Sequence, residues 1–250
     1  MSGLYDRTRA LLRASLRDSP GLRRALVEAE TLSELARHSL AGKLPQLIRP
    51  RTRKLTVAIT AYCNLRCIGC RYGRDFMPGR QLSLEMVRDL LDDGRAGGAE
   101  VVRLYGGEPL LHPDLPAMVR HATELGLTTY VTTNGVLLEE RLDELVDAGL
   151  RDLTFGFYGT GAEYDEYVQR TGRFERVERG LAAARERYGD MLSLQLNFLI
   201  MRPSCNPESL AAAWDFACRY DMSFHTDLVH YSLPYFAPGL DGELQFRAED

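Results

Sequence analysis

The chain has 250 residues, 31 Lys and Arg against 35 Asp and Glu, a formal net charge of −4, and 45% hydrophobic residues. These values are ordinary for a folded domain and exclude a disordered chain, a collagen or a disulfide-rich miniprotein. The acidic excess argues against binding along a nucleic-acid backbone, so we expect no nucleic-acid partner. The apolar runs are shorter than a membrane span and the N-terminus lacks a secretory signal, so we expect no membrane association.

Residues 1–50 are predicted to form a helical extension, because leucine and alanine recur there with an imperfect helical period. Ser19, Pro20 and Gly21 interrupt this pattern, as turn-forming residues do. We expect the main domain over residues 51–235 and a polar tail over residues 236–250. The pattern contains no amphipathic helix after the last predicted strand, which suggests that the chain is part of a longer polypeptide.

From residue 54 onward, predicted strands and helices alternate. The predicted strands span residues 55–60, 100–105, 127–133, 152–158, 192–201 and 223–231, and the helices between them span residues 84–96, 115–125, 139–148, 174–188 and 207–220. Repeated β-α units indicate an α/β fold with a parallel sheet, and right-handed connections curl such a sheet. The sequence therefore predicts a partial (β/α)6 TIM-like barrel, with its functional site at the carboxyl ends of the strands.

The five cysteines indicate where the chemistry lies. An odd number in a chain without a secretory signal favours a reducing compartment such as the cytoplasm over a disulfide framework. Cys63, Cys67 and Cys70 are spaced as Cys-x3-Cys-x2-Cys directly after the first predicted strand. Such dense thiolates suggest a zinc site completed by a remote ligand, or an iron–sulfur cluster in which three cysteines leave one iron open. The cysteine spacing alone leaves both possibilities open.

Two motifs in order suggest a family. The segment Cys63-Asn64-Leu65-Arg66-Cys67-Ile68-Gly69-Cys70 resembles the cluster loop of the radical S-adenosylmethionine (radical SAM) enzymes. The turn Gly106-Gly107-Glu108-Pro109, after the second predicted strand, resembles the GGEP motif of the same family. The resemblance extends over residues 54–231 and is closest in pattern to the molybdenum-cofactor cyclase and SPASM/Twitch branch.

The resemblance implies both the cofactors and the chemistry. Cys63, Cys67 and Cys70 would hold a [4Fe-4S] cluster, and S-adenosyl-L-methionine (SAM) would chelate the fourth iron. A reducing electron donor of the flavodoxin or ferredoxin type would supply the electron that cleaves SAM. The resulting 5′-deoxyadenosyl radical would abstract hydrogen from an unknown organic substrate, for which the branch suggests a peptide or a natural-product precursor. No cysteine follows Cys218, so an auxiliary cluster of the SPASM type is either absent or lies outside this sequence.

The same resemblance suggests residues that bind SAM. Glycines allow close approach of the backbone to a ligand, and a carboxylate with neighbouring carbonyls would accept hydrogen bonds from the SAM ammonium group. Arg170 is the candidate partner of the SAM carboxylate, with a solvated surface charge as the alternative. Asn197 is expected near SAM, with an internally satisfied buried amide as the alternative. The full candidate set is Gly106, Gly107, Glu108, Pro109, Asn134, Tyr158, Arg170 and Asn197.

Polar residues also gather at the end of the sixth predicted strand. Asp227, His230 and Tyr231 are candidate substrate contacts, although polar groups satisfied at a strand end explain them equally well. Two alternatives to consumption of SAM remain. In the first, the chain is a non-catalytic iron–sulfur or zinc-binding protein on the same scaffold. In the second, it uses SAM reversibly as a cofactor.

Overall fold

A computed structural model describes residues 19–45, 52–72, 74–75, 77–229 and 244–247. The chain divides into two compact units, Met1–Arg51 and Thr52–Asp250. In the first unit, helix α2 (Pro20–Lys43) begins directly after Ser19, so the interruption seen in the sequence is the start of a helix. Proline suits that position because the first turn of a helix needs no backbone N–H donor there. None of the helices in the described ranges has both the length and the apolar character needed to cross a membrane.

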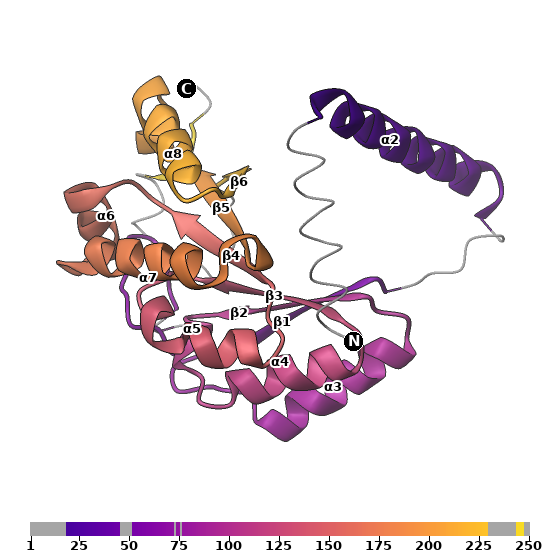
Figure 1. Cartoon of the computed structure of the whole chain (residues 1–250), viewed down its shortest axis with the longest axis horizontal. Helices are drawn as coiled ribbons and strands as arrows, with labels where there is room; N and C mark the ends of the chain where they lie inside the picture. Colours follow the sequence, from indigo (N-terminus) through magenta and orange to yellow (C-terminus); the bar gives the residue numbers. More distant parts are fainter. Residues whose placement is uncertain (1–18, 46–51, 73, 76, 230–243, 248–250) are drawn as a thin grey trace. The chain divides into compact units, whose positions relative to one another are not determined.

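The second unit contains a six-stranded parallel sheet (Figure 1). The strands are β1 (Lys54–Thr60), β2 (Val101–Gly106), β3 (Thr128–Thr133), β4 (Asp152–Phe157), β5 (Ser193–Ile200) and β6 (Ser223–Leu228). They pair in chain order, so that β1 and β6 form the two edges. This arrangement confirms the predicted parallel α/β fold. All six strands lie within about two residues of their predicted bounds, except that the sixth ends at Leu228.

Helices and short 3-10 turns connect the strands (Figure 1). The helices are α3 (Leu84–Ala96), α4 (Leu115–Glu124), α5 (Leu138–Asp147), α6 (Gly161–Val168), α7 (Arg173–Tyr188) and α8 (Pro207–Arg219), and the 3-10 turns are η2 (Pro109–Leu111), η3 (Gly189–Met191) and η4 (Arg202–Ser204). The sequence did not predict α6, which has eight residues. It buries one short stripe, Tyr164 and Val168, which is too little to give a periodic signal.

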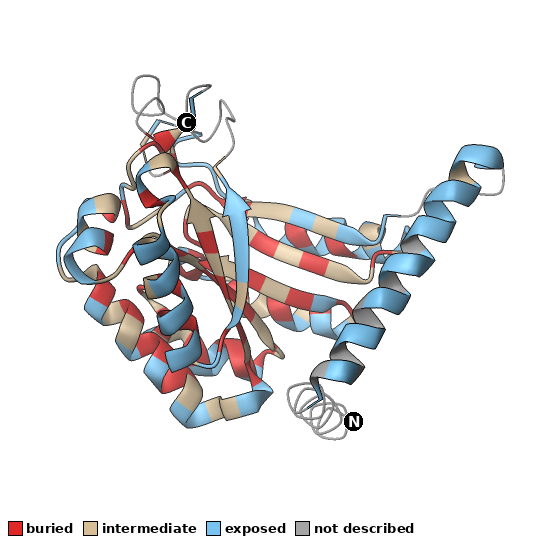
Figure 2. Cartoon of the chain, turned by 90° about the horizontal axis from the view of Figure 1, so that it is seen from above, coloured by how far each residue is buried: buried red, intermediate tan, exposed pale blue. Residues whose placement is uncertain are grey.

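Strand residues alternate between two environments (Figure 2). One set, which includes Leu104, Phe155 and Phe198, is almost fully buried in the core that the helices cover. The other set lies on the opposite surface of the sheet, which we call the inner face. Parallel register aligns its members across the strands: Arg103 with Tyr130, Thr132 with Thr154, Thr154 with Gln195, Gly156 with Asn197, and Asn197 with His225. The inner face is therefore the polar side of the sheet.

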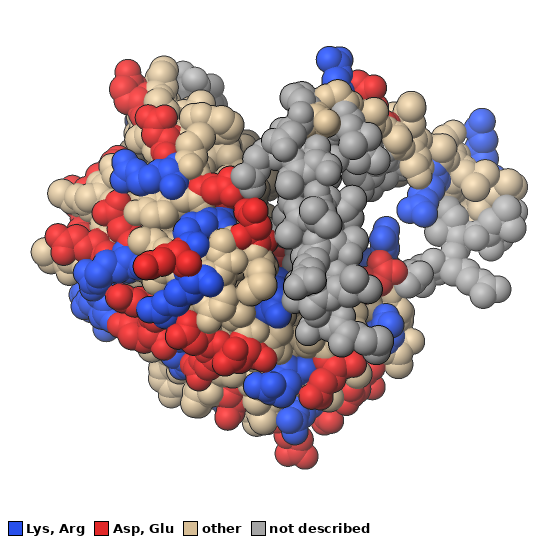
Figure 3. Space-filling view, viewed as in Figure 1, with Lys and Arg blue, Asp and Glu red and all other residues tan. Residues whose placement is uncertain are grey.

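Charges of both signs intermingle on the surface seen in Figure 3. Ion pairs also link α5 to α7, such as Asp143 with Arg187 and Glu139 with Arg179. Exposed pairs of this kind contribute little to stability because solvent screens them.

Candidate functional site

The two sequence motifs are in direct backbone contact. The amide of Gly107 donates to the carbonyl of Thr60 at 2.8 Å, and the amide of Glu108 donates to the carbonyl of Tyr62 at 2.7 Å. The pairing of β1 with β2 thus continues past the strands into the cysteine loop, residues 61–75. A Cβ atom at Gly107 would lie 2.2 Å from the carbonyl oxygen of Tyr62. The close approach that glycine permits here is therefore made to the cysteine loop of the protein itself.

Glu108 is fully buried at the end of this turn. Its carboxylate accepts hydrogen bonds from the hydroxyl of Thr133 at 2.7 Å, from the amide of Asn134 at 2.8 Å and from the amide of Leu110 at 2.9 Å. Burial, the dominant effect, raises the pKa of Glu108 to about 7. Glu108 thus connects the ends of β2 and β3, a role that the sequence pattern did not predict. Its expected contact with the SAM ammonium group stays a prediction.

The pKa of Glu108 leads to an expected pH dependence. Its ordinary value is 4.5 and its folded value is about 7, so the folded chain binds more protons than the unfolded chain between these values. The free energy of unfolding should therefore fall as the pH rises from about 4.5 to 7, by up to about 3 kcal/mol. Urea unfolding of the metal-free chain at pH 5 and pH 8 measures this difference. The Glu108→Gln variant should show a flatter profile, whereas Glu124→Gln, at an exposed position on α4, should keep the wild-type slope. Equal slopes for the wild type and Glu108→Gln would contradict this assignment.

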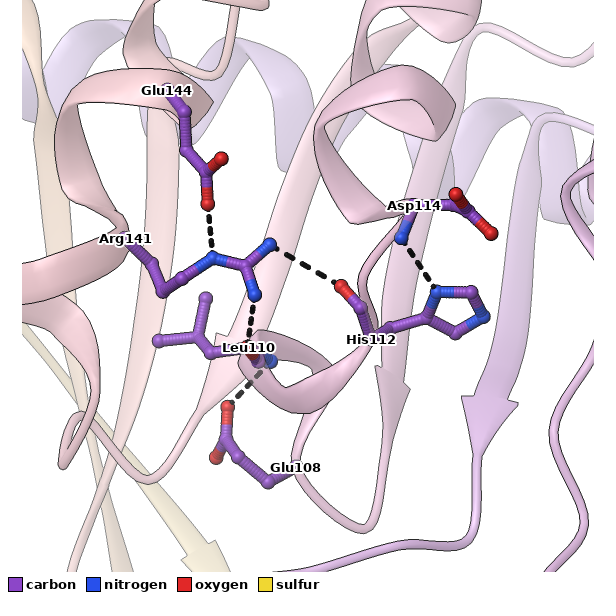
Figure 4. Close-up of polar contacts among 6 residues, drawn as sticks. All are labelled: Glu108, Leu110, His112, Asp114, Arg141 and Glu144. Atoms are coloured by element: carbon purple, nitrogen blue, oxygen red, sulfur yellow. Dashed lines mark hydrogen bonds and ion pairs between the residues drawn. The ribbon is translucent and has the colours of Figure 1, made fainter.

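Arg141 on α5 holds the turn from its other side (Figure 4). Its guanidinium donates to the carbonyl of Leu110 at 2.9 Å and to that of His112 at 3.3 Å, and it pairs with Glu144. The buried His112 ring accepts from the amide of Asp114 at 3.1 Å, and its Nε2 lies 2.9 Å from the carbonyl of Leu82. These contacts fix the segment after Glu108. No motif spacing in the sequence connects Arg141 to this turn.

Asn134 connects β3 to the cysteine loop. Its side-chain nitrogen donates to Oδ1 of Asn64 at 2.8 Å and lies 4.0 Å from Sγ of Cys63. Its own Oδ1 accepts from the amide of Val136 at 3.0 Å. The structure therefore places this candidate beside the first cysteine of the motif.

The three motif cysteines are half-buried in a loop fastened to the end of α6. The amide of Arg66 donates to the carbonyl of Val168 at 3.2 Å, and the amide of Ile68 donates to that of Tyr167 at 2.9 Å. Burial raises the pKa of all three thiols, that of Cys63 to about 12.

The donor set and its placement fit an iron–sulfur cluster. Across the described ranges, no three His, Cys, Asp or Glu side chains converge as the ligands of one metal ion would. In a [4Fe-4S] cluster each thiolate binds a different iron, so three cysteines need not converge on one point. Cys63, Cys67 and Cys70 lie in one partly buried loop of the kind that such a cluster requires.

Two tyrosines lie next to the cysteine loop. Tyr158, directly after β4, stacks on Tyr167 with ring centroids 4.6 Å apart. Burial raises the pKa of Tyr158, and the neighbouring Cys67, Cys70 and Cys63 raise it further. A Cβ atom at Gly156 would lie 2.7 Å from the Tyr158 hydroxyl, so glycine leaves room for this ring over the inner face. The structure thus places Tyr158 beside the cysteine loop.

The remaining candidates differ in their surroundings. Asn197 lies on the inner face, and its Oδ1 is buried without a hydrogen-bond partner among the described residues. Such an unsatisfied acceptor suits a ligand hydroxyl or ammonium group. Arg170 is exposed after α6, where its guanidinium donates to the carbonyl of Gln169 at 3.0 Å. Asp227 is exposed on β6, and His230 and Tyr231 lie outside the described residues.

Curated relatives match more than half of the chain. The chain is 36% identical over 154 residues to the GTP 3',8-cyclase of Chlorobaculum tepidum, a match that covers 61% of this chain and 46% of that protein. It is 33% identical over 137 residues to the AdoMet-dependent heme synthase of Methanosarcina barkeri, covering 54% of this chain and 39% of that protein. The chain thus spans about half the length of the curated relatives that it matches.

Solved structures show the same fold. SuiB of Streptococcus suis superposes with a TM-score of 0.62 at 18% sequence identity, over 94% of this chain and 53% of that chain. SuiB bound to S-adenosylmethionine gives a TM-score of 0.61 at 17% identity, over 94% of this chain and 54% of that chain. The sequence profile of the radical SAM superfamily matches residues 57–203. Because that profile spans more than half of the chain and includes both motifs that the structure joins, the chain belongs to the radical SAM superfamily.

Proposed function

We propose that this protein cleaves S-adenosylmethionine reductively and abstracts a hydrogen atom from an organic substrate. The observation that carries the proposal is the backbone ladder from Thr60 and Tyr62 to Gly107 and Glu108, which joins the cysteine loop to the glycine turn. The superfamily uses a [4Fe-4S] cluster and SAM, which together supply the 5′-deoxyadenosyl radical when bound. An electron donor of the flavodoxin or ferredoxin type is the proposed partner.

The protein's own residues would bind and orient these groups. Cys63, Cys67 and Cys70 would hold three irons of the cluster, with Asn134 beside Cys63. The unpartnered Oδ1 of Asn197 would accept a hydrogen bond from SAM, and Tyr158 would close the space beside the cysteine loop. Arg170 remains the proposed partner of the SAM carboxylate. The inner face would hold the substrate.

The inner face suggests the chemistry of the substrate. Nε of Arg103 donates to the hydroxyl of Thr132 at 3.0 Å, and its guanidinium carbon lies 4.9 Å from the ring centroid of Tyr105. None of the ion pairs among the described residues involves Arg103. An unneutralised guanidinium favours a substrate with a carboxylate or phosphate group.

We propose a peptide or natural-product precursor as the substrate class, with Asp227, His230 and Tyr231 as further contacts. This proposal is supported by the fold shared with SuiB, whose structure has been solved bound to the precursor peptide SuiA. The identity to GTP 3',8-cyclase favours a second candidate, a nucleoside triphosphate. Deuterium transfer from labelled substrate into 5′-deoxyadenosine distinguishes the two. Transfer from GTP alone would replace the peptide proposal.

Arg103→Gln should weaken binding of anionic probes about tenfold, because a charge-assisted hydrogen bond contributes about 1.5 kcal/mol. The measurement is calorimetric titration of the cluster-loaded protein with GTP and with a glutamate-containing peptide. Arg120→Gln, at an exposed position on α4, serves as the matched control and should bind as the wild type does. Equal affinities in both variants would remove Arg103 from the substrate site.

Metal loading separates the proposed function from its alternatives. Anaerobic reconstitution with iron and sulfide should give about four irons per chain, as expected for a [4Fe-4S] centre. Addition of SAM should then change the electron paramagnetic resonance (EPR) spectrum of the reduced cluster. Preferential loading of one zinc ion would favour the non-catalytic alternative. Consumption of SAM in step with product, rather than its recovery, would exclude reversible use.

A further inference from the structure

Arg74 connects the cysteine loop to the turn that follows α6. One of its terminal nitrogens, Nη2, donates to the carbonyl of Arg66 at 2.5 Å, to that of Cys67 at 3.5 Å and to Oε1 of Gln169 at 2.6 Å. This side chain adds to the two backbone hydrogen bonds from the cysteine loop to the end of α6. A single guanidinium thus fixes two carbonyls beside the second cysteine.

The charge of Arg74 is not neutralised by an ion pair within the described residues. Asp75, its neighbour, pairs instead with Arg71 at 3.0 Å. The Nε atom of Arg74 is buried and has no hydrogen-bond partner in the part of the chain that the structure describes. A guanidinium keeps its charge at all ordinary pH values. The site therefore contains a partly buried cation with an unused donor.

This cation lies close to the second of the three cysteines. Its Nη2 lies 3.5 Å from the carbonyl oxygen of Cys67 and 2.5 Å from that of Arg66, the residue before it. One-electron reduction adds negative charge to a cluster, so a nearby cation stabilises the reduced form. Net charge and hydrogen bonds around the sulfurs are known determinants of cluster potentials.

We propose that Arg74 is a positioning residue for the cluster: it fixes the cysteine loop against the turn after α6, and its charge raises the cluster's reduction potential. This inference rests on the proposed function, because it requires that Cys63, Cys67 and Cys70 hold a cluster. Arg74 would act through the loop and its charge without contact to the substrate.

The test is a redox titration of the reconstituted protein in the absence of SAM, in which EPR measures the fraction of reduced cluster. Arg74→Gln should shift the one-electron reduction equilibrium about tenfold toward the oxidised form, which corresponds to about 59 mV. Arg74→Lys keeps the positive charge, so the reduction potential should stay near that of the wild type. It loses the guanidinium that contacts the carbonyls of the loop, so iron should be released faster to a chelator. Arg80→Gln removes an exposed arginine of the same region and should change neither quantity.

Gln169→Glu provides an independent test of the charge. It keeps the acceptor for Arg74 and adds a carboxylate beside it, so the potential should fall even if Arg74→Gln fails to retain iron. An unchanged potential in Gln169→Glu would overturn the charge role, as would equal potentials in Arg74→Gln and Arg80→Gln. Unchanged iron release in Arg74→Lys would overturn the positioning role. A wild-type protein that forms no cluster would instead contradict the proposed function.

Discussion

Replacing Cys63, Cys67 or Cys70 by alanine is expected to abolish SAM cleavage, each by itself. In the proposed cluster each thiolate would bind a separate iron, so a single loss would leave that iron without its protein ligand. No other cysteine of the loop could replace the lost thiolate. The two remaining cysteines are exposed elsewhere, Cys205 just before α8 and Cys218 on α8. The measurement is iron content and 5′-deoxyadenosine formation after anaerobic reconstitution, and product from each variant should not exceed background.

Cys218→Ala is the matched control for these variants. It removes a thiol from the exposed surface of α8 and should retain the iron content and product formation of the wild type. Full activity in all three motif variants would contradict the assignment of these cysteines as cluster ligands. A loss of activity in Cys218→Ala comparable to that of the motif variants would show that the effect is not specific to the loop.

The second large effect is expected from Gly107→Ala. The added Cβ would lie 2.2 Å from the carbonyl oxygen of Tyr62, a backbone atom that a rotamer change does not move. The ladder that joins the glycine turn to the cysteine loop must then separate, at a cost of about 3 kcal/mol, the upper range for overpacking. We expect a lower unfolding midpoint in urea for the metal-free chain and poor iron retention after reconstitution.

Gly126→Ala isolates the steric part of this effect. Gly126 has a positive φ of 72°, but no atom lies within 4 Å of the point that a Cβ would occupy, so alanine there meets backbone strain without a clash. It should cost about 1 kcal/mol, as a left-handed non-glycine residue does. If Gly107→Ala were as stable as Gly126→Ala, the close contact with Tyr62 would not determine the shape of the loop. Because the clash is structural, substitution of Gly107 does not separate an enzyme from a non-catalytic cluster protein.

The order of the helices and strands could be predicted from the sequence, because the residue patterns that indicate each element are local. The helix predicted over residues 84–96 is α3, and the hydroxyl of Ser83, directly before it, accepts from the amide of Met86 at 3.2 Å. Successive residues of a strand face opposite sides of the sheet, so Asn197 and Gln195 share the inner face of β5. These features depend on neighbours within one turn or one strand, which a pattern records.

The contacts within the site were not predictable because they join distant segments. Glu108 was expected to accept from a ligand, yet Thr133 and Asn134, some 25 residues later, donate to its carboxylate. Arg74 and Gln169 are 95 residues apart and meet where the cysteine loop crosses the end of α6. A polar side chain gives the same signal in sequence whether it contacts a ligand or another segment of the chain.

The most direct test of the central claim is formation of 5′-deoxyadenosine. The chain is reconstituted anaerobically with iron and sulfide, reduced with dithionite and incubated with SAM, beside the Cys63→Ala and Cys218→Ala variants. The account predicts reductant-dependent 5′-deoxyadenosine from the wild type and from Cys218→Ala, and none above background from Cys63→Ala. A wild-type chain that holds a [4Fe-4S] cluster and shows no more 5′-deoxyadenosine than Cys63→Ala would contradict reductive SAM cleavage by this protein.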